Sequence, residues 1–417
     1  MKKIFLYCFS LFVLANGLWA GSAYADLVPG SVITAANLEQ NLSQKFEGVP
    51  LGDMLTESQK IWIKQYGLKV TLAAPKENPV SASFIANTKR FSGQVKLNPQ
   101  TLRVENFVAG MPFPDVAVDD PLGGRKLMWN YYYSALLTGD SIDSSGIVML
   151  VSSTKGLERV SSAENYRFIL KGRGTEPHDI SNGGPSKILM AFLTSPYDLA
   201  GVGAYIERPD NGGPDQTYIY LKSLRRIRRV SGQTYADPFL ASDLLGEDTN
   251  MFDSNPLWYP GMKIIGKRKL LVVANGAPLA QKDRGRGEAY INLAAPPYWN
   301  PSIDYKWEPR EVYVIEVTPK ESHPYSKKLV YMDVHWPIIW QVENFNRAGK
   351  LWKMVMDLYY PLKQGDGEPG IMISHIYTID WQAAHATVIG VPPGLINRPG
   401  AKLADYSYNR MADALNK

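Results

Sequence analysis

Cysteine is almost absent from this chain of 417 residues. The single cysteine, Cys8, lies within the first 25 residues, and a chain cleaved behind that segment contains none. Such a chain forms no disulfide bond, offers no thiolate nucleophile and builds neither a thiolate zinc site nor an iron–sulfur cluster. It also offers no cysteine for a lipid anchor, so we expect an exported form that is soluble and is not a lipoprotein.

Long apolar runs and an excess of one charge are missing as well. Beyond the first 25 residues no stretch of 18 apolar residues occurs, whereas a helix that spans a bilayer needs about 20. Removal of residues 1–25 takes away two lysines and no acid, so the formal net charge falls from +5 to +3. We therefore expect no membrane-spanning segment and no electrostatic attraction to nucleic acid.

The motifs that mark common enzyme classes are absent too. The chain has no G-x-S-x-G, H-E-x-x-H or Walker sequence. Its five histidines include no pair at i,i+4 and no pair with a recognisable metal spacing. These absences favour a binding protein over an enzyme, and they predict neither a metal site nor a cofactor.

The first 25 residues have the layout of a secretory signal peptide. Met1–Lys3 is a short basic start, Ile4–Ala15 is an apolar run, and Ala23-Tyr24-Ala25 fits the small-residue cleavage pattern. We predict cleavage after Ala25 and export from the cytoplasm.

Strand signals dominate the remaining residues, 26–417. Short apolar segments recur every 8–15 residues with Gly, Pro, Asn or Asp between them, which favours antiparallel meanders over βαβ units. The predicted strands are 68–72, 146–152, 166–171, 187–193, 203–208, 216–221, 225–230, 263–274, 311–317, 327–334, 338–344, 351–360 and 371–381.

Three helices are predicted, all in the N-terminal third. Leu38, Leu42 and Phe46 recur every four residues before Gly48. Thr56-Glu57-Ser58-Gln59 is a capping box that begins a helix ending at Gly67. A third helix is expected from Asp120-Pro121 to Thr138, with a stripe formed by Met128, Tyr131, Tyr132 and Ala135.

The clearest strand alternates between apolar and polar residues. Trp352, Met354 and Met356 occupy even positions of 351–360, and Lys353 and Asp357 occupy odd positions. This alternation predicts a sheet with one dry and one wet face. Because an apolar face must be buried, we expect the few helices to cover it.

A basic run is followed by an acidic one. Arginines cluster at 225–229, and acids follow at 237–253. We expect them to form ion pairs between the sheet and a short acidic helix, with Arg226, Arg228 and Asp243 as candidates. An arginine left unpaired could instead bind an anionic head group.

Two further features leave alternatives open. Asp333 and His335 could place a carboxylate and an imidazole together, as an envelope hydrolase would need, or could be a polar pair at a strand end. Residues 275–310, rich in proline, are interpreted as a surface excursion, and a structural adaptor of a transporter or outer-membrane complex could use it as a contact surface.

The order of these segments resembles a known family of envelope proteins. The segments are Tyr218–Leu221, Leu224–Arg229, Phe239–Asp243, Trp258-Tyr259-Pro260, Lys263–Lys267, Glu311–Glu316, Tyr325–Asp333 and Phe345–Trp352. They are similar to outer-membrane lipoprotein-sorting (LolA/LolB-like) proteins, and more closely to domain-of-unknown-function family 1329 of Gram-negative bacteria.

The resemblance implies an α+β fold, a large curved antiparallel sheet that forms a LolA-like open half-barrel, with helices covering its concave face. It places a single domain at 26–417, with an N-terminal helical elaboration at 26–140. The implied function is a soluble periplasmic carrier for a lipid or other hydrophobic molecule, without catalysis. An RND-type transporter or an outer-membrane protein is the implied partner. The predicted cleft lining is Met128, Tyr131, Tyr132, Leu244, Trp352, Met354 and Met356.

Overall fold

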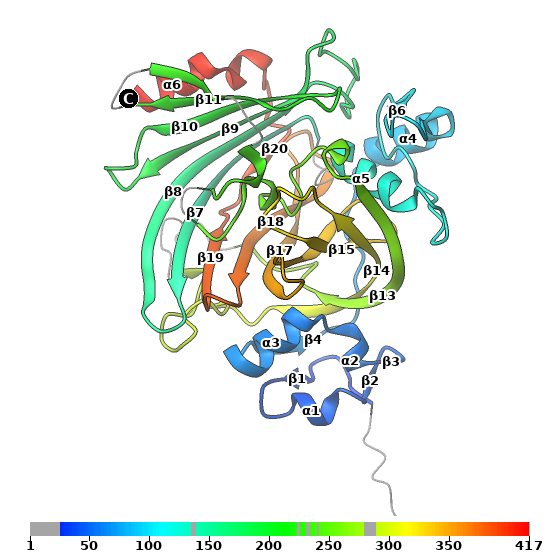
Figure 1. Cartoon of the computed structure of the whole chain (residues 1–417), viewed down its shortest axis with the longest axis vertical. Helices are drawn as coiled ribbons and strands as arrows, with labels where there is room; N and C mark the ends of the chain where they lie inside the picture. Colours follow the sequence, from blue (N-terminus) through cyan, green and yellow to red (C-terminus); the bar gives the residue numbers. More distant parts are fainter. Residues whose placement is uncertain are drawn as a thin grey trace, which may run out of the picture.

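The computed structural model describes residues 26–134, 139–222, 226–230, 234–239, 242–278 and 289–416, so the predicted signal peptide lies outside the described residues. One large sheet dominates it (Figure 1). Its strands are β1 (Val32–Ile33), β4 (Val70–Leu72), β7 (Ser141–Ser152), β8 (Gly156–Ile169), β9 (Pro185–Ser195), β10 (Val202–Pro209), β11 (Gln216–Leu221), β12 (Arg226–Val230), β13 (Gly261–Val272), β14 (Lys306–Thr318), β15 (Lys327–Asp333), β16 (Ile339–Phe345), β17 (Leu351–Lys363), β18 (Pro369–Asp380), β19 (His385–Gly390) and β20 (Leu395–Ile396).

The sheet is antiparallel and open. Its order is β1-β4-β14-β15-β16-β17-β18-β19-β7-β8-β9-β10-β11-β12, with β13 also paired to β14 and β20 to β7. Among the pairings between the described strands of this sheet, only the short β4–β14 contact is parallel. No described pairing joins β12 to β13, so the sheet curves without closing (Figure 1). The predicted α+β class and open antiparallel sheet are confirmed.

The strands predicted beyond residue 146 are present, but several stretches were missed. The first ten residues of β8, the first five residues of β7 and of β14, and the whole of β19 and β20 were not predicted. Strand β19 was missed because the polar residues His385 and Thr387 interrupt its apolar pattern. In the structure both side chains bind the carboxylate of Asp243 at 2.7 Å.

Helices are few and short. They are α1 (Leu38–Asn41), α2 (Leu51–Met54), α3 (Glu57–Tyr66), α4 (Ala82–Phe91), α5 (Gly123–Ser134) and α6 (Tyr408–Asn416). The capping box of α3 is confirmed: the Thr56 hydroxyl accepts from the Gln59 amide, the Gln59 side chain accepts from the Thr56 amide, and Gly67 ends the helix at a φ of 67°. None of the described helices combines the length and the apolar character needed to cross a membrane.

The predicted helix through Leu38, Leu42 and Phe46 is wrong beyond its first turn. Phe46 lies in β2 (Lys45–Phe46), which pairs with β3 (Val49–Pro50). Glu47 and Gly48 both have positive φ, as a two-residue hairpin turn requires, and this turn overrides the helical spacing. The third predicted helix is α5, and its expected end at 135–138 lies outside the described residues.

Hydrophobic cores lie on both faces of the sheet. On β17, Val355 and Tyr359 belong to an inner core with α5 and residues 235–262, whereas Met354 and Met356 belong to an outer core with residues 33–72 and 290–307. The expected wet face of this strand is therefore wrong, because Lys353 is 6% exposed and Asp357 is 1% exposed.

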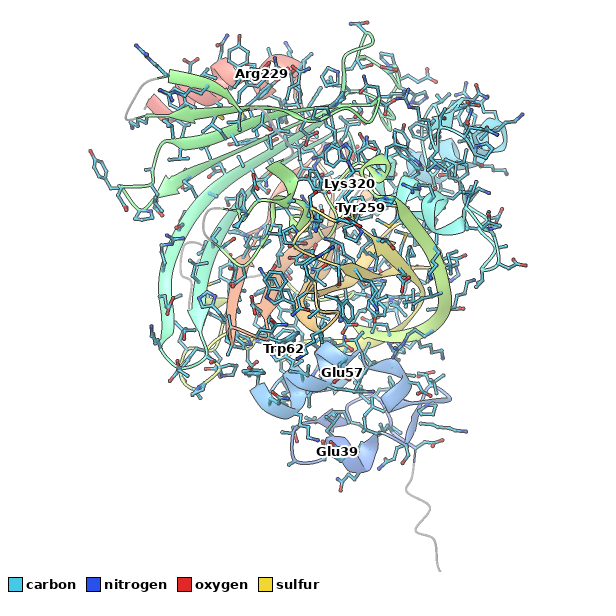
Figure 2. The ribbon with its side chains drawn as sticks, viewed as in Figure 1. Glu39, Glu57, Trp62, Arg229, Tyr259 and Lys320 are labelled. Carbon is cyan, nitrogen blue, oxygen red and sulfur yellow. The ribbon has the colours of Figure 1, made fainter. Side chains whose placement is uncertain are left out.

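The outer core joins the N-terminal segments to the sheet. Trp62 of α3 lies at this junction (Figure 2), donates to Asn300 at 2.7 Å, and its ring lies 5.1 Å from that of Tyr377. Glu343 of β16 accepts from the amide of Ser58 in the first turn of α3 at 2.8 Å. Trp299 is fully buried in the same core, so the segment expected to be a surface excursion contributes to the interior.

Candidate hydrophobic ligand groove

Strands β8 to β12, at one end of the sheet, have one covered face and one partly open face. The covered face packs against α6 in a third cluster that includes Met190, Phe192, Tyr205 and Met411. A Cβ on Gly203 would lie 2.9 Å from the side chain of Met411. Helix α6 therefore packs directly against the back of this part of the sheet (Figure 1).

The open face carries apolar side chains that stay partly exposed. They are Leu189, Ala191, Val202, Ala204, Ile206, Ile219 and Val230. Exposed apolar surface that is concave and contiguous marks a binding site more often than scattered apolar residues do.

Small residues hollow out the centre of this face. Ala204 lies opposite Ala191 on one side and opposite Ile219 on the other, and Ala163 lies opposite Leu193. Because alanine fills less space than the surrounding leucine and isoleucine, a groove of about 370 Å³ remains above these strands. We call it the apolar groove, and its volume lies within the range of small-molecule sites.

Residues 234–239 and 242–260 form the opposite wall of the apolar groove. Tyr235, Pro238, Phe239 and Thr249 line it from this side. The Tyr235 ring stacks on Trp258 with centroids 4.6 Å apart. The wall is tied to α5 as well: the buried Arg125 donates to the carbonyls of Tyr259 at 2.9 Å and Pro260 at 3.2 Å.

A buried ion cluster fixes the base of this wall. The Lys328 ammonium contacts Glu247 and lies 3.1 Å from Asp248, and the three side chains are fully buried. The Tyr325 hydroxyl donates to Asp248 at 2.7 Å. Burial would raise the pKa of Glu247, but Lys328 and then His323 outweigh it and hold the pKa at about 2. Glu247 is therefore ionised at neutral pH.

One end of the apolar groove is polar. Arg208 donates to Asp215 through Nε at 2.9 Å and Nη2 at 2.7 Å, and it also binds Asp253 from the opposite wall. Such bidentate charge-assisted bonds fix side-chain geometry. Burial would raise the pKa of Asp253, but Arg208 and Lys187 outweigh it and lower that pKa.

The structure does not bring the predicted cleft residues onto one surface. Met128, Tyr131, Tyr132 and Leu244 belong to the inner core, but Met354 and Met356 belong to the outer core on the opposite face of the sheet. Trp352 lies at the rim, where its indole donates to Asp380 at 2.7 Å. Of this set, Tyr132 borders a cavity, which is polar.

The predicted ion pairs of Arg226 and Arg228 with Asp243 do not occur among the described residues, and Arg225 lies outside them. Arg226 and Arg228 are exposed on β12, and Asp243 binds His385 and Thr387. The hydrogen bond that His385 donates to the carboxylate of Asp243 raises the pKa of His385. The acids from 243 to 253 find their cations on other strands, far away in sequence.

Asp333 and His335 do not form a catalytic pair. One oxygen of Asp333 accepts from the amides of His335 and Trp336 at 2.9 and 3.3 Å, and the other accepts from the Trp340 indole at 3.1 Å. His335 is exposed. The carboxylate therefore caps a turn, which is the second of the two interpretations that the sequence leaves open.

Sequence reasoning missed the residues of the apolar groove. Residues 188–193 are apolar at every position, which indicates a strand with two apolar faces. One face is covered by α6, and the other lines the groove. The run of apolar residues was the available signal, but it does not say which face stays uncovered.

Comparison with known proteins identifies the family. The family model described as "Protein of unknown function (DUF1329)" matches residues 32–400. The chain belongs to this family. The family predicted from the sequence is therefore confirmed.

Individual relatives are distant. A protein of Pseudomonas aeruginosa, "Uncharacterized protein PA3922", is 25% identical over 345 residues, which cover 79% of this chain and 69% of that protein. A solved DUF1329 family protein from Desulfovibrio piger is 15% identical with a TM-score of 0.46, covering 70% of this chain and 99% of that one. A solved putative outer membrane lipoprotein-sorting protein domain from Vibrio parahaemolyticus is 16% identical with a TM-score of 0.43, covering 66% of this chain and 92% of that one.

Proposed function

We propose that this protein binds a lipid or other hydrophobic molecule in the periplasm and carries it between envelope components. The observation that carries the proposal is the apolar groove, where partly exposed Leu189, Ile206 and Ile219 face a hollow of about 370 Å³. A chain of ten methylene groups buried there would gain about 8 kcal/mol before the cost of association. With an association cost of about 4 kcal/mol, the low end of its range, about 4 kcal/mol would remain, which corresponds to weak and reversible binding.

Transfer without catalysis fits such a site. A carrier hands over its ligand when the acceptor binds it more tightly than the carrier does, so no bond has to break. The predicted signal peptide supports a periplasmic location. A membrane transporter or an outer-membrane protein would be the donor or acceptor.

Filling the apolar groove tests the proposal. Ala204 lies at its centre, and Ala204→Trp adds a large side chain to the hollow without touching the face covered by α6. We expect this variant to lose at least tenfold in affinity for a fluorescent long-chain fatty alcohol and a fluorescent long-chain fatty acid, measured by titration. Ala383→Trp, in the exposed turn between β18 and β19, is the matched control and should bind as the unaltered protein does.

The same experiment can refute the proposal. If the unaltered protein binds neither probe, or if Ala204→Trp binds both with unchanged affinity while its circular dichroism spectrum is retained, the groove is not a site for hydrophobic ligands. Native mass spectrometry of gently purified protein provides a second measurement, because a bound lipid adds its own mass.

A further inference from the structure

Three cations lie in a row on neighbouring strands next to the polar end of the apolar groove, and of the three Arg208 lines the groove itself. Arg167 on β8, Lys187 on β9 and Arg208 on β10 point to the same face of neighbouring strands. Lys187 pairs in register with Arg208, and each lies two residues beyond an apolar groove residue, Leu189 or Ile206. Because side chains alternate with a period of two, this face of the strands changes from apolar residues that line the groove to cations just beyond it.

The cations are buried and are not equally well paired. The side chains of Arg167, Lys187 and Arg208 are 5%, 6% and 4% exposed. Arg208 binds two carboxylates, as described above. Arg167 and Lys187 share Asp253, at 3.9 and 3.8 Å, and both distances exceed that of a hydrogen bond. Within the part of the chain that the structure describes, no closer carboxylate neutralises either of them.

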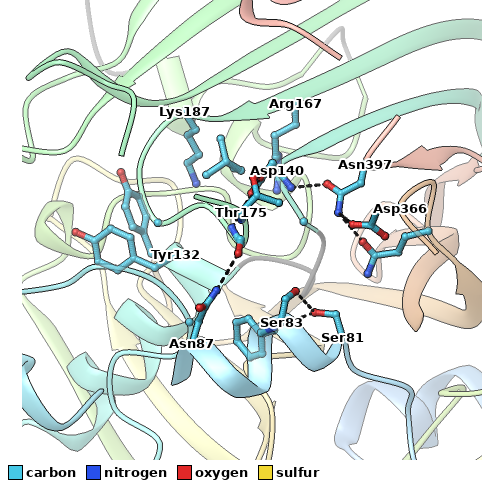
Figure 3. A pocket seen from close by; sticks show the side chains of 18 residues that line it. Ser81, Ser83, Asn87, Tyr132, Asp140, Arg167, Thr175, Lys187, Asp366 and Asn397 are labelled. Carbon is cyan, nitrogen blue, oxygen red and sulfur yellow. Dashed lines mark hydrogen bonds between the residues drawn. The ribbon is translucent and has the colours of Figure 1, made fainter. Parts of the chain in front are cut away.

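Arg167 and Lys187 also border a small polar cavity of about 60 Å³, shown in Figure 3. Hydroxyl and amide side chains from several elements complete its lining, among them Ser81, Asn87, Thr175 and Asn397. A cavity of this size has room for a few water molecules or one small anionic group. Two acids line the cavity, Asp140 and Asp366. Asp140 accepts from the amide of Gly174 and from Thr175, and it pairs with Arg173 at 3.0 Å. Asp366 accepts from the side chain of Asn397 and forms no ion pair with Arg167 or Lys187 among the described residues.

The charge balance of this end favours an anion. Three cations face two carboxylates, Asp215 and Asp253, which leaves one positive charge when Lys187 is protonated. A buried charge without a close partner is costly. Burial lowers the pKa of Lys187 to about 7, with Arg208 and Arg167 acting in the same direction against Asp253. One added negative charge would offset this cost, whereas a cationic group would increase it.

We propose that the ligand of the apolar groove is an anionic amphiphile, whose chain lies along β8 to β11 and whose head group is bound by Arg167, Lys187 and Arg208. This inference rests on the proposed function. It names the chemical class of the ligand: a long apolar chain that ends in one carboxylate or phosphate.

The test compares amphiphiles that differ only in charge. Hexadecanoic acid and hexadecanol compete for a fluorescent long-chain probe at pH 7, and we expect the acid to bind at least tenfold more tightly. Lys187→Gln and Arg167→Gln should each weaken acid binding about tenfold and leave alcohol binding unchanged. Lys350→Gln, in the exposed turn before β17, is the matched control and should change neither.

The pH dependence separates a binding role of Lys187 from a structural one. The charged and titratable groups around Lys187 are Arg167, Arg208, Asp215, Asp253 and Tyr132, together with Tyr133, Asp140 and Asp366 of the polar cavity. Binding of an anion requires the protonated ammonium, so affinity for the acid should fall about tenfold from pH 7 to pH 8.5, while affinity for the alcohol stays constant. Lys187→Arg should keep acid binding and remove this pH dependence.

The outcomes distinguish the two proposals. Equal affinity for acid and alcohol would overturn the assignment of an anionic head group and leave the proposed function intact. If neither compound binds, both proposals fail. If sodium acetate or inorganic phosphate displaces the probe at the same concentration as the acid does, the site binds a free anion, and the amphiphile assignment is wrong.

Discussion

The contribution of the buried ion cluster at the base of the groove wall to the stability of the protein can be measured by removing its cation. Lys328→Met keeps the length of the side chain and removes its charge. Among the described residues, Lys328 carries the only ammonium that contacts both Glu247 and Asp248. The change removes it and leaves the two carboxylates buried side by side. Loss of one partner from a buried ion pair costs about 3–5 kcal/mol. The lowered pKa of Glu247 gives a similar figure, because a fall from 4.5 to about 2 corresponds to about 3 kcal/mol.

Urea unfolding at pH 7, followed by tryptophan fluorescence, measures this loss. Lys327→Met is the matched control: the neighbouring ammonium lies 4.4 Å above the Phe345 ring and is partly exposed, so its removal should cost less than about 1 kcal/mol. In Lys328→Met/Glu247→Gln one uncompensated charge is gone, and part of the stability should return.

If Lys328 keeps Glu247 ionised, the stability of the unaltered protein and that of Lys328→Met should respond to rising pH in opposite directions. In the unaltered protein the contribution of Glu247 is present above pH 4.5 and is lost as pH falls through about 2. Without Lys328, burial dominates and raises the pKa of Glu247, so the variant should lose stability as pH rises from 5 to 8. A Lys328→Met protein as stable as Lys327→Met, or one whose deficit does not depend on pH, would refute this account.

Two other predictions concern groups buried in the cores. Burial raises the pKa of Asp357 well above its usual range, so stability from this group is present at low pH and is lost as pH rises past 4. Asp357→Asn should therefore equal or exceed the unaltered protein in stability at pH 8, by about 1.4 kcal/mol for each unit of the shift, and a less stable variant at pH 8 would contradict the assignment. Thr56→Ala removes the cap of α3 and the acceptor of Gln341 at 2.7 Å, and it should cost about 2–3 kcal/mol in urea unfolding. The exposed turn variant Thr154→Ala should cost less than about 0.5 kcal/mol.

Local patterns predicted local structure well. The capping box of α3 needs only Thr56, Gln59 and their own backbone, so four residues of sequence contain the whole interaction. Strand segments were found for the same reason, since alternation and turn residues are local features. The helix expected through Phe46 failed where two residues with positive φ, Glu47 and Gly48, formed a hairpin turn.

The candidate site depends on contacts that are distant in sequence. Glu247 and Lys328 are 81 residues apart, and Asp253 meets Arg208 across 45 residues. From the sequence, these acids were instead predicted to pair with the nearest basic run, residues 225–229. Which face of a strand is covered is equally non-local: Met354 looks like a cleft residue from its alternation, but the N-terminal segments cover it.

The described part of the basic run lies on β12, the last strand at one end of the sheet. Strand β12 has a neighbour on one side only in the described sheet. Its residues Arg226, Arg228 and Arg229 are exposed, and Figure 2 labels Arg229. An unpaired edge offers backbone donors and acceptors to any passing strand, and charged side chains on that edge oppose such pairing. An open sheet edge next to an apolar groove favours self-association, and exposed arginines on that edge are a feature that opposes it.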